Sequence, residues 1–114
     1  MNKIFDWAEK VSFAVTICDE NADVVYMNAK SRSTFASHGS MIGKNLKECH
    51  PQHAWEKIQH MLATGESNTY TITKNGIKKI IHQSPWYKEG SDKPAGLVEI
   101  SIILPEAVPH YDRK

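Results

Sequence analysis

The 114 residues of this chain are enough for one domain with a single hydrophobic core, and 40% of them are apolar. The formal net charge is +1, and no basic cluster is longer than Lys78-Lys79, which argues against a nucleic-acid-binding surface. No apolar run approaches the roughly 18 residues that cross a membrane. The first residues lack the apolar core of a signal peptide, so we expect a cytoplasmic protein. The two cysteines, Cys18 and Cys49, are too few for a disulfide framework and are expected to be buried, reduced thiols.

The first third of the chain is predicted to form a short helix followed by a β-hairpin. Apolar residues recur at helical spacing over residues 3–11. The runs 13–18 and 23–27 are rich in β-forming residues, and the acidic and amide residues between them favour a turn. Asn28 ends the second run, where its side-chain oxygen can accept a free backbone N–H and so begin the weakly helical segment 28–37.

The clearest helix of the sequence begins near Pro51 and ends at Thr64-Gly65. Proline is favoured at the first helical position, and glycine is typical of a helix end. The residues that form one apolar stripe along this helix are Ala54, Trp55, Ile58, Met61 and Leu62.

Three strands are predicted after this helix. Residues 69–73 alternate between two faces, and Asn75-Gly76 then favours a tight hairpin turn into the long strand 77–86. The last strand covers residues 97–104. The residues that share one face of the long strand are Ile80, His82, Ser84 and Trp86. The order of elements predicts an α+β domain with one antiparallel sheet and helices packed on one face.

Four pieces of the sequence, in this order, resemble the PAS family of sensory domains. They are the hairpin from Phe13 to Asn28, the connector Ile42-Gly43-Lys44-Asn45-Leu46, the helix exit Leu62-Ala63-Thr64-Gly65 and the strand Ala95-Gly96-Leu97-Val98-Glu99-Ile100-Ser101. The resemblance covers about residues 10–104. It implies a five-stranded antiparallel sheet in the order 2-1-5-4-3, with helices packed on one face and an N-terminal cap helix.

The resemblance also implies an organisation and a function. The cap helix would occupy residues 1–12, the PAS-like core residues 13–104 and a C-terminal tail residues 105–114. A small molecule or cofactor would bind between helices and sheet, and the signal would pass on through protein–protein contact. The start at Met1 and the polar C-terminus favour a complete small protein.

Apolar and aromatic residues of the long helix and the sheet are the predicted contacts of such a ligand. His82 would be a polar handle if its face of strand 77–86 turned toward the helix. The predicted contacts are Phe35, His50, Trp55, Ile58, Leu62, Tyr70, Ile80, His82 and Ile100. The alternative is a packed core without a ligand, in a module for protein–protein interaction or dimerisation.

The tripeptide Cys49-His50-Pro51 resembles one subgroup of heme-binding PAS sensors. A neutral imidazole can be the axial ligand of heme iron, so a third reading is a heme-based gas or redox sensor with His50 as the metal ligand. His50 could instead cap the helix end or lie at the surface. Flavin is not expected, because Cys49 is followed by His-Pro and not by the motif of flavin photoreceptors. Cys49 and His53 lack the second pair of ligands that a zinc site needs.

The sequence does not indicate an enzyme. Asp19 and Glu20 are adjacent in a turn, where solvated charges are normal, and no third group accompanies a Cys–His pair. The apolar stripe of the first helix favours packing on the sheet or on a partner subunit. We expect a symmetric homodimer and an unidentified protein partner, without nucleic-acid or membrane binding.

Overall fold

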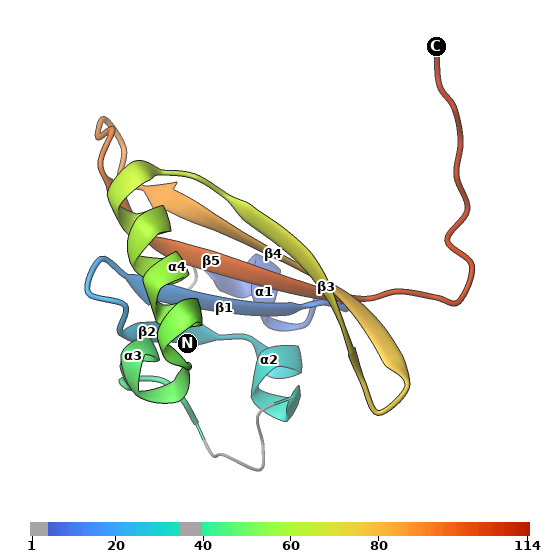
Figure 1. The fold of residues 1–114 in the computed structure, drawn as a ribbon, viewed down its shortest axis with the longest axis horizontal. Helices are drawn as coiled ribbons and strands as arrows, with labels where there is room; N and C mark the ends of the chain where they lie inside the picture. Colours follow the sequence, from blue (N-terminus) through green and yellow to red (C-terminus); the bar gives the residue numbers. More distant parts are fainter. Residues whose placement is uncertain (1–4, 35–39) are drawn as a thin grey trace.

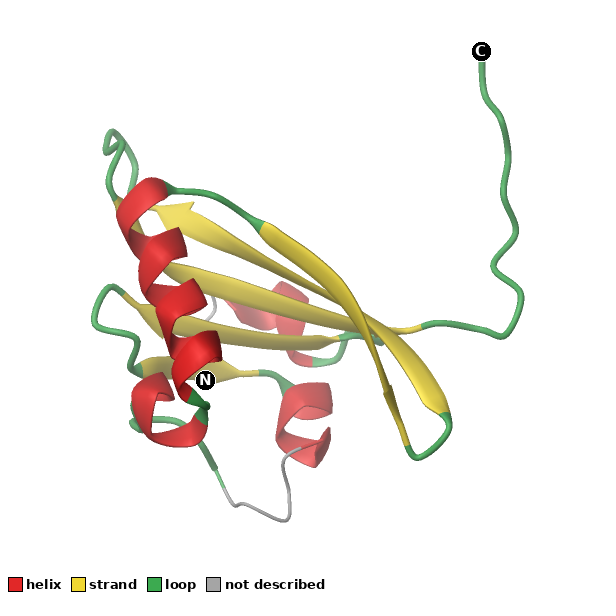
Figure 2. Cartoon of the chain, in the orientation of Figure 1, coloured by secondary structure: helices red, strands yellow, loops and turns green. Residues whose placement is uncertain are grey.

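The computed structural model describes residues 5–34 and 40–114, which contain a five-stranded sheet with helices on both faces (Figures 1 and 2). All neighbouring strands are antiparallel, and their order is β2-β1-β5-β4-β3. The predicted fold class and strand order are therefore confirmed. The elements are α1 (Asp6–Glu9), β1 (Ala14–Asp19), β2 (Val24–Met27), α2 (Ala29–Thr34), α3 (Leu46–Cys49), α4 (Gln52–Thr64), β3 (Asn68–Lys74), β4 (Ile77–Tyr87) and β5 (Pro94–Ile103).

Two turns fix the hairpins as the sequence predicts. In the first, Asp19 Oδ1 accepts the backbone N–H groups of Asn21 at 2.9 Å and Asp23 at 3.0 Å. In the second, Asn75 and Gly76 both have positive φ, at 53° and 78°, as a type I′ turn between strands requires. Each turn thus helps to set the register of the strands that it joins.

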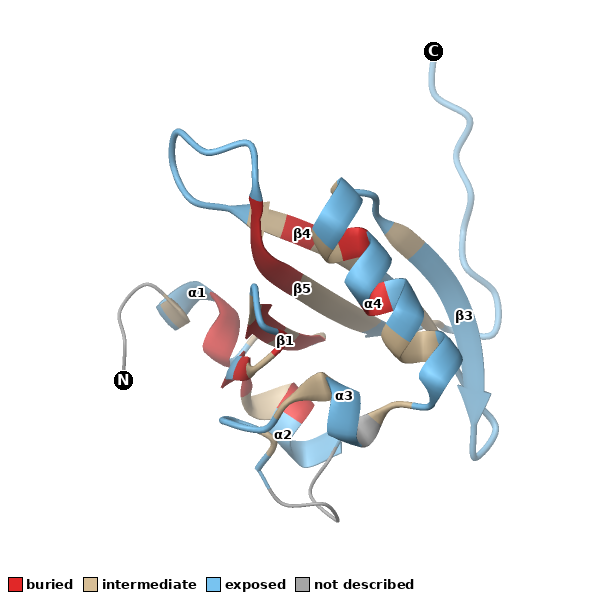
Figure 3. Ribbon diagram, turned by 60° about the vertical axis from the view of Figure 1, so that its left-hand side comes forward, coloured by how far each residue is buried: buried red, intermediate tan, exposed pale blue. Residues whose placement is uncertain are grey.

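Helix α4 covers the same face of the sheet as α2 and α3 (Figure 1). Its buried residues Ile58 and Met61 pack against Cys18 of β1 and Leu97 of β5. Figure 3 shows α4, in which buried and exposed segments alternate, beside β5, whose first residues are buried. The helix ends where predicted, since Gly65 adopts the left-handed conformation at φ 83° and donates its N–H to the Met61 carbonyl.

Helix α1 packs on the opposite face of the sheet. A second hydrophobic cluster, separate from the one under α4, lies between α1 and the sheet. Its buried residues are Ala8, Val15, Ile17 and Tyr26. The ring of Phe5 stacks on that of Tyr26 with 4.4 Å between centroids. Glu9 accepts a hydrogen bond from the Tyr26 hydroxyl at 2.8 Å and pairs with Arg32 of α2. The helix predicted over residues 3–11 is thus observed as a shorter cap tied to β2 and α2, and its first two residues lie outside the described part.

The C-terminal residues 105–114 leave the sheet as an exposed extension without helix or strand (Figure 1). Pro105 and Pro109 agree with this, since proline interrupts regular backbone hydrogen bonding. Within residues 5–34 and 40–114, none of the helices has the length and apolar character to span a membrane.

Candidate ligand-binding site

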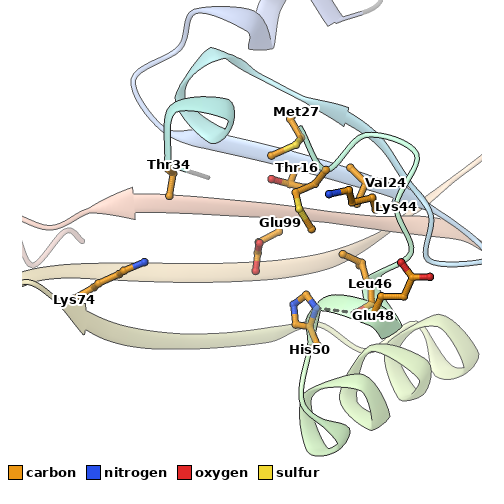
Figure 4. Close-up of a pocket in the computed structure, with 11 residues that line it drawn as sticks. Thr16, Val24, Met27, Thr34, Lys44, Leu46, Glu48, His50, Lys74 and Glu99 are labelled. Atoms are coloured by element: carbon orange, nitrogen blue, oxygen red, sulfur yellow. Dashed lines mark hydrogen bonds between the residues drawn. The ribbon is translucent and has the colours of Figure 1, made fainter. Parts of the chain in front are cut away.

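A cavity of about 590 Å³ lies between the sheet on one side and the end of α2 and residues 41–50 on the other. Thr16 and Glu99 line it from the sheet, and Leu46 and His50 line it from α3 and the residue that follows α3 (Figure 4). Further apolar lining comes from Val24, Met27 and Met41. A smaller hollow of about 40 Å³ reaches Ile58 of α4. It shares four lining residues with the larger cavity, which are Thr16, Leu46, His50 and Glu99. The larger cavity falls within the roughly 300–1,000 Å³ typical of small-molecule sites.

Glu99 is the charged residue that lines the cavity from the centre of the sheet, whereas Lys74 lines it from the end of the edge strand β3. Glu99 lies in the central strand β5, opposite Thr16 of β1 and Gln83 of β4. Glu99 Oε1 accepts a hydrogen bond from Gln83 Nε2 at 3.0 Å, and Gln83 Oε1 accepts one from Asn68 Nδ2 at 3.1 Å. Burial raises the pKa of the Glu99 carboxyl, an effect that the Gln83 hydrogen bond and the charge of His50 offset only in part. Within the described part of the chain, Glu99 Oε2 accepts no hydrogen bond.

His50 faces Glu99 from the helical side of the cavity (Figure 4). Its Nδ1 lies 2.9 Å from the backbone oxygen of Leu46. Because a carbonyl oxygen can only accept, this contact assigns the proton to Nδ1 and leaves Nε2 as the acceptor of the neutral ring. The sequence places His50 between α3 and α4, and the Leu46 carbonyl then fixes the direction of its ring.

Other charges of the cavity lie at its rim. Lys44, Glu48 and Lys74 line it but are exposed to solvent, where water screens their charges. Cys18 reaches only the smaller hollow, and burial raises the pKa of its thiol to about 11. Cys18 therefore stays protonated at neutral pH and is a poor nucleophile. Among the residues that the structure describes, no three His, Cys, Asp or Glu side chains are grouped to hold a metal ion.

His82 was a predicted ligand contact on the assumption that its face of β4 turns toward α4 and the cavity. This assumption is wrong. His82 pairs with Ile100 of β5, and Ile100 pairs with Val15 of β1, which is buried beneath α1. Because directly paired residues share a face, Ile80, His82 and Ile100 lie on the α1 side of the sheet and not on the cavity side. His82 is exposed, and its Nδ1 lies 2.7 Å from Thr69 Oγ1.

The other predicted contacts divide between the cavity and the core. His50 lines the cavity, and Ile58 lines the smaller hollow. Trp55 and Leu62 pack against the buried cluster between α4 and the sheet. Phe35 lies outside the described residues.

Sequence reasoning missed the polar residues on the cavity side of the sheet. Thr16, Gln83 and Glu99 share this face by register. Tyr70 of β3, which was a predicted contact, lies on the same face but is not among the residues that line the cavity. The burial of Tyr70 and the charge of Glu99 raise the pKa of the Tyr70 hydroxyl. The available signal was Glu99, the one charged residue of the mostly apolar strand 97–104. A charge among apolar residues costs free energy unless it has a partner or a function.

Replacing Glu99 by glutamine is expected to stabilise the domain at pH 7 and to have little effect at pH 4. The folded-state pKa of Glu99 is raised above the unfolded value of about 4.3. The resulting penalty is absent below the unfolded pKa, grows as the pH rises and is complete above the folded pKa. Urea unfolding at both pH values measures the effect, with Glu48→Gln at the exposed rim as the control. A lower urea midpoint for Glu99→Gln at pH 7 would contradict the expectation.

The comparisons with known proteins agree with this architecture. No family model and no curated protein matches the sequence. The PAS domain of histidine kinase ThkA is 16% identical with a TM-score of 0.63, over 79% of this chain and 97% of that one. VqmA of Vibrio cholerae, bound to DPO, is 16% identical with a TM-score of 0.68, over 90% of this chain and 57% of that one. The Aer2 receptor of Vibrio cholerae, a dual PAS-heme oxygen sensor, is 11% identical with a TM-score of 0.63, over 82% of this chain and 96% of that one. The strand order, the placement of the helices and these similar structures together show that this chain has the PAS fold.

Proposed function

We propose that this chain is a cytoplasmic sensory domain that binds a small molecule or cofactor in the cavity and signals through protein–protein contact. The observation that carries the proposal is a cavity of about 590 Å³ with a half-buried carboxyl on its sheet side, of which only one oxygen accepts a hydrogen bond among the described residues. Such a carboxyl lowers the stability of the free domain and suits recognition better than packing. We propose binding and not catalysis, in keeping with the protonated state of Cys18.

The similar structures support a binding function for this fold. VqmA is described in complex with DPO, and Aer2 is described as a PAS-heme oxygen sensor. ThkA is a histidine kinase that contains a PAS domain. Those are properties of the similar proteins, and they favour a sensory function for a chain that shares their fold.

A short series of contacts connects the cavity with the cap helix α1. Thr16, which lines the cavity, shares a hydrogen bond of 2.6 Å with Ser31 of α2 through their hydroxyls. The next residue of α2, Arg32, pairs with Glu9 of α1. A ligand that binds two arrangements of α2 unequally would thereby shift the position of α1.

The exposed side of α1 is the proposed contact of the signal with other proteins. Trp7 is 61% exposed on this short helix, and burial in a symmetric homodimer would remove its ring from water. Equilibrium sedimentation at micromolar concentration is expected to show a dimer, and Trp7→Ala is expected to shift it toward monomer. A wild-type monomer under these conditions would contradict homodimerisation.

A cavity-filling variant tests the proposed function. Met41 lines the cavity, whereas the neighbouring Ile42 is 48% exposed and does not line it. Native mass spectrometry and an absorption spectrum of freshly purified protein are expected to show a bound small molecule. Met41→Trp should lose this molecule, and Ile42→Trp should retain it. Equal retention by both variants would exclude the cavity as its site.

The alternative is a ligand-free module for protein–protein interaction or dimerisation. The packed clusters on both faces of the sheet favour it, because they hold the fold together without any ligand. This alternative expects no bound molecule in any preparation and the same sedimentation behaviour for wild type, Met41→Trp and Ile42→Trp.

A heme-based gas or redox sensor is the second candidate, favoured by the orientation of His50. Metal-binding histidines commonly donate their other ring N–H to a carbonyl, as His50 does to Leu46. His50 would hold the iron through Nε2, and the heme would supply gas binding or redox chemistry. Titration with hemin is expected to give a Soret band that His50→Ala abolishes and His53→Ala, on the exposed side of α4, retains. An unchanged spectrum in His50→Ala would refute this assignment.

A further inference from the structure

Two hydrogen-bond acceptors face each other across the cavity without a donor between them. One is Glu99 Oε2, since among the described residues only Oε1 of this carboxylate is bonded. The other is Nε2 of His50, which is an acceptor in the neutral form of the ring, where the Nδ1 hydrogen is directed at the Leu46 carbonyl. Figure 4 shows the two side chains directed into the same space from opposite walls.

We propose that the cavity selects a small organic cation with at least two N–H donors, which bind Glu99 Oε2 and His50 Nε2. This inference rests on the proposed function, because it assumes that the cavity binds a small molecule. Ammonium and amidinium groups have this chemistry: they carry several N–H donors and a positive charge in a compact group.

The state of Glu99 favours a cation over a neutral or anionic ligand. Withdrawing part of a carboxylate from water costs free energy, and in half-buried Glu99 the Gln83 side chain supplies one donor to a group that has room for about four. A cationic ligand that donates to Oε2 would compensate this charge. A neutral ligand would supply a hydrogen bond without the opposite charge, and an anion would add repulsion.

The remaining charges of the cavity do not reverse this preference. Lys44 and Lys74 would attract an anion, and Glu48 would attract a cation. All three are exposed at the rim, where water and salt weaken their effect. Glu99 is half-buried in the central strand, where a charge interacts more strongly with a bound group than at the exposed rim. The inner carboxylate therefore sets the charge preference.

Three probes of nearly equal shape and different charge test the inference: benzamidine, benzamide and benzoate. Titrations followed by isothermal calorimetry at pH 7.5 are expected to show benzamidine binding at least tenfold more tightly than benzamide, with benzoate the weakest. Glu99→Gln is expected to remove the advantage of benzamidine, and Glu48→Gln is expected to preserve it. His50→Ala should weaken benzamidine several-fold and leave the order of the three probes unchanged.

The outcomes separate this inference from the function on which it rests. Benzamide or benzoate binding as tightly as benzamidine would overturn the preference for a cation and leave a cavity that binds small molecules. An unchanged advantage of benzamidine in Glu99→Gln would likewise overturn the assignment to Glu99. Failure of all three probes to bind would also overturn the inference, whereas the proposed function is decided by the Met41→Trp experiment, which uses none of them.

Discussion

Replacing Gly96 by alanine is expected to destabilise the domain by about 3 kcal/mol or more, at the upper end of overpacking effects. Gly96 lies in β5, where the backbone of β1 and the indole of Trp86 approach it closely. An added Cβ would lie 1.9 Å from the Cys18 carbonyl oxygen, 2.5 Å from Trp86 Nε1 and 2.9 Å from Asp19 Cα. Relief requires β1 to move away from β5 or the indole to leave the hydrogen bond of 2.9 Å that it donates to Cys18. Either movement disturbs the centre of the sheet.

Urea unfolding followed by circular dichroism measures this effect. Ser101→Ala, in the same strand and without a side-chain hydrogen bond among the described contacts, is the control and is expected to change stability by less than about 0.5 kcal/mol. Trp86→Phe should fall between the two, because it removes the donor and keeps much of the ring. A wild-type midpoint for Gly96→Ala would mean that the two strands are not this close in solution.

Local sequence signals predicted the order of the elements, and the resemblance to the PAS family predicted the strand order. Asn75-Gly76 specifies a turn with two positive φ angles, and Gly65 specifies a left-handed helix end. Asn28 was predicted to begin a helix, and its Oδ1 does accept the Ser31 N–H at 2.9 Å. Each of these features depends on residues within a few positions of one another, which a sequence displays directly.

The choice of faces on β4 could not be predicted from the sequence in the same way. One face carries Ile80 and Trp86, and the other carries Ile81 and Pro85, so both look apolar. Hydrophobic alternation identifies the core side of a strand only when the other side is polar. Because α1 packs on one face of the sheet and α4 on the other, both faces are partly covered, and the pattern was ambiguous.

The composition of the cavity was equally hidden, because it depends on residues far apart in the chain. The Glu99 carboxyl meets the Gln83 amide only in the register of β4 and β5. The direction of the His50 ring depends on the carbonyl of Leu46, one turn earlier. The tripeptide at residues 49–51 identified His50 as a candidate, but only the structure shows that the Glu99 carboxylate lies opposite its ring.

Asn28 joins four segments of the chain, which exceeds the capping role that its sequence position suggests. Its side chain is fully buried, with 0% of its surface exposed. Oδ1 accepts the backbone N–H groups of Val15 and Ser31, each at 2.9 Å. Nδ2 donates to the carbonyls of Ala8 at 2.8 Å and Phe13 at 2.9 Å. One amide therefore satisfies backbone groups of α1, of the segment before β1, of β1 and of α2.

Asn28→Ala is expected to destabilise the domain by about 4 kcal/mol, because each buried backbone group left without a partner costs about 1–3 kcal/mol. Asn28→Asp should also be strongly destabilising, since it keeps both acceptor bonds but places an oxygen against the carbonyls of Ala8 and Phe13. Asn68→Ala, which removes a side-chain bond at the edge strand β3, is the matched control and should cost about 1 kcal/mol or less. Urea unfolding gives the free energies, and hydrogen exchange should show α1 losing protection first in the Asn28 variants. Equal effects of Asn28→Ala and Asn68→Ala would mean that the Asn28 amide does not hold these four segments together in solution.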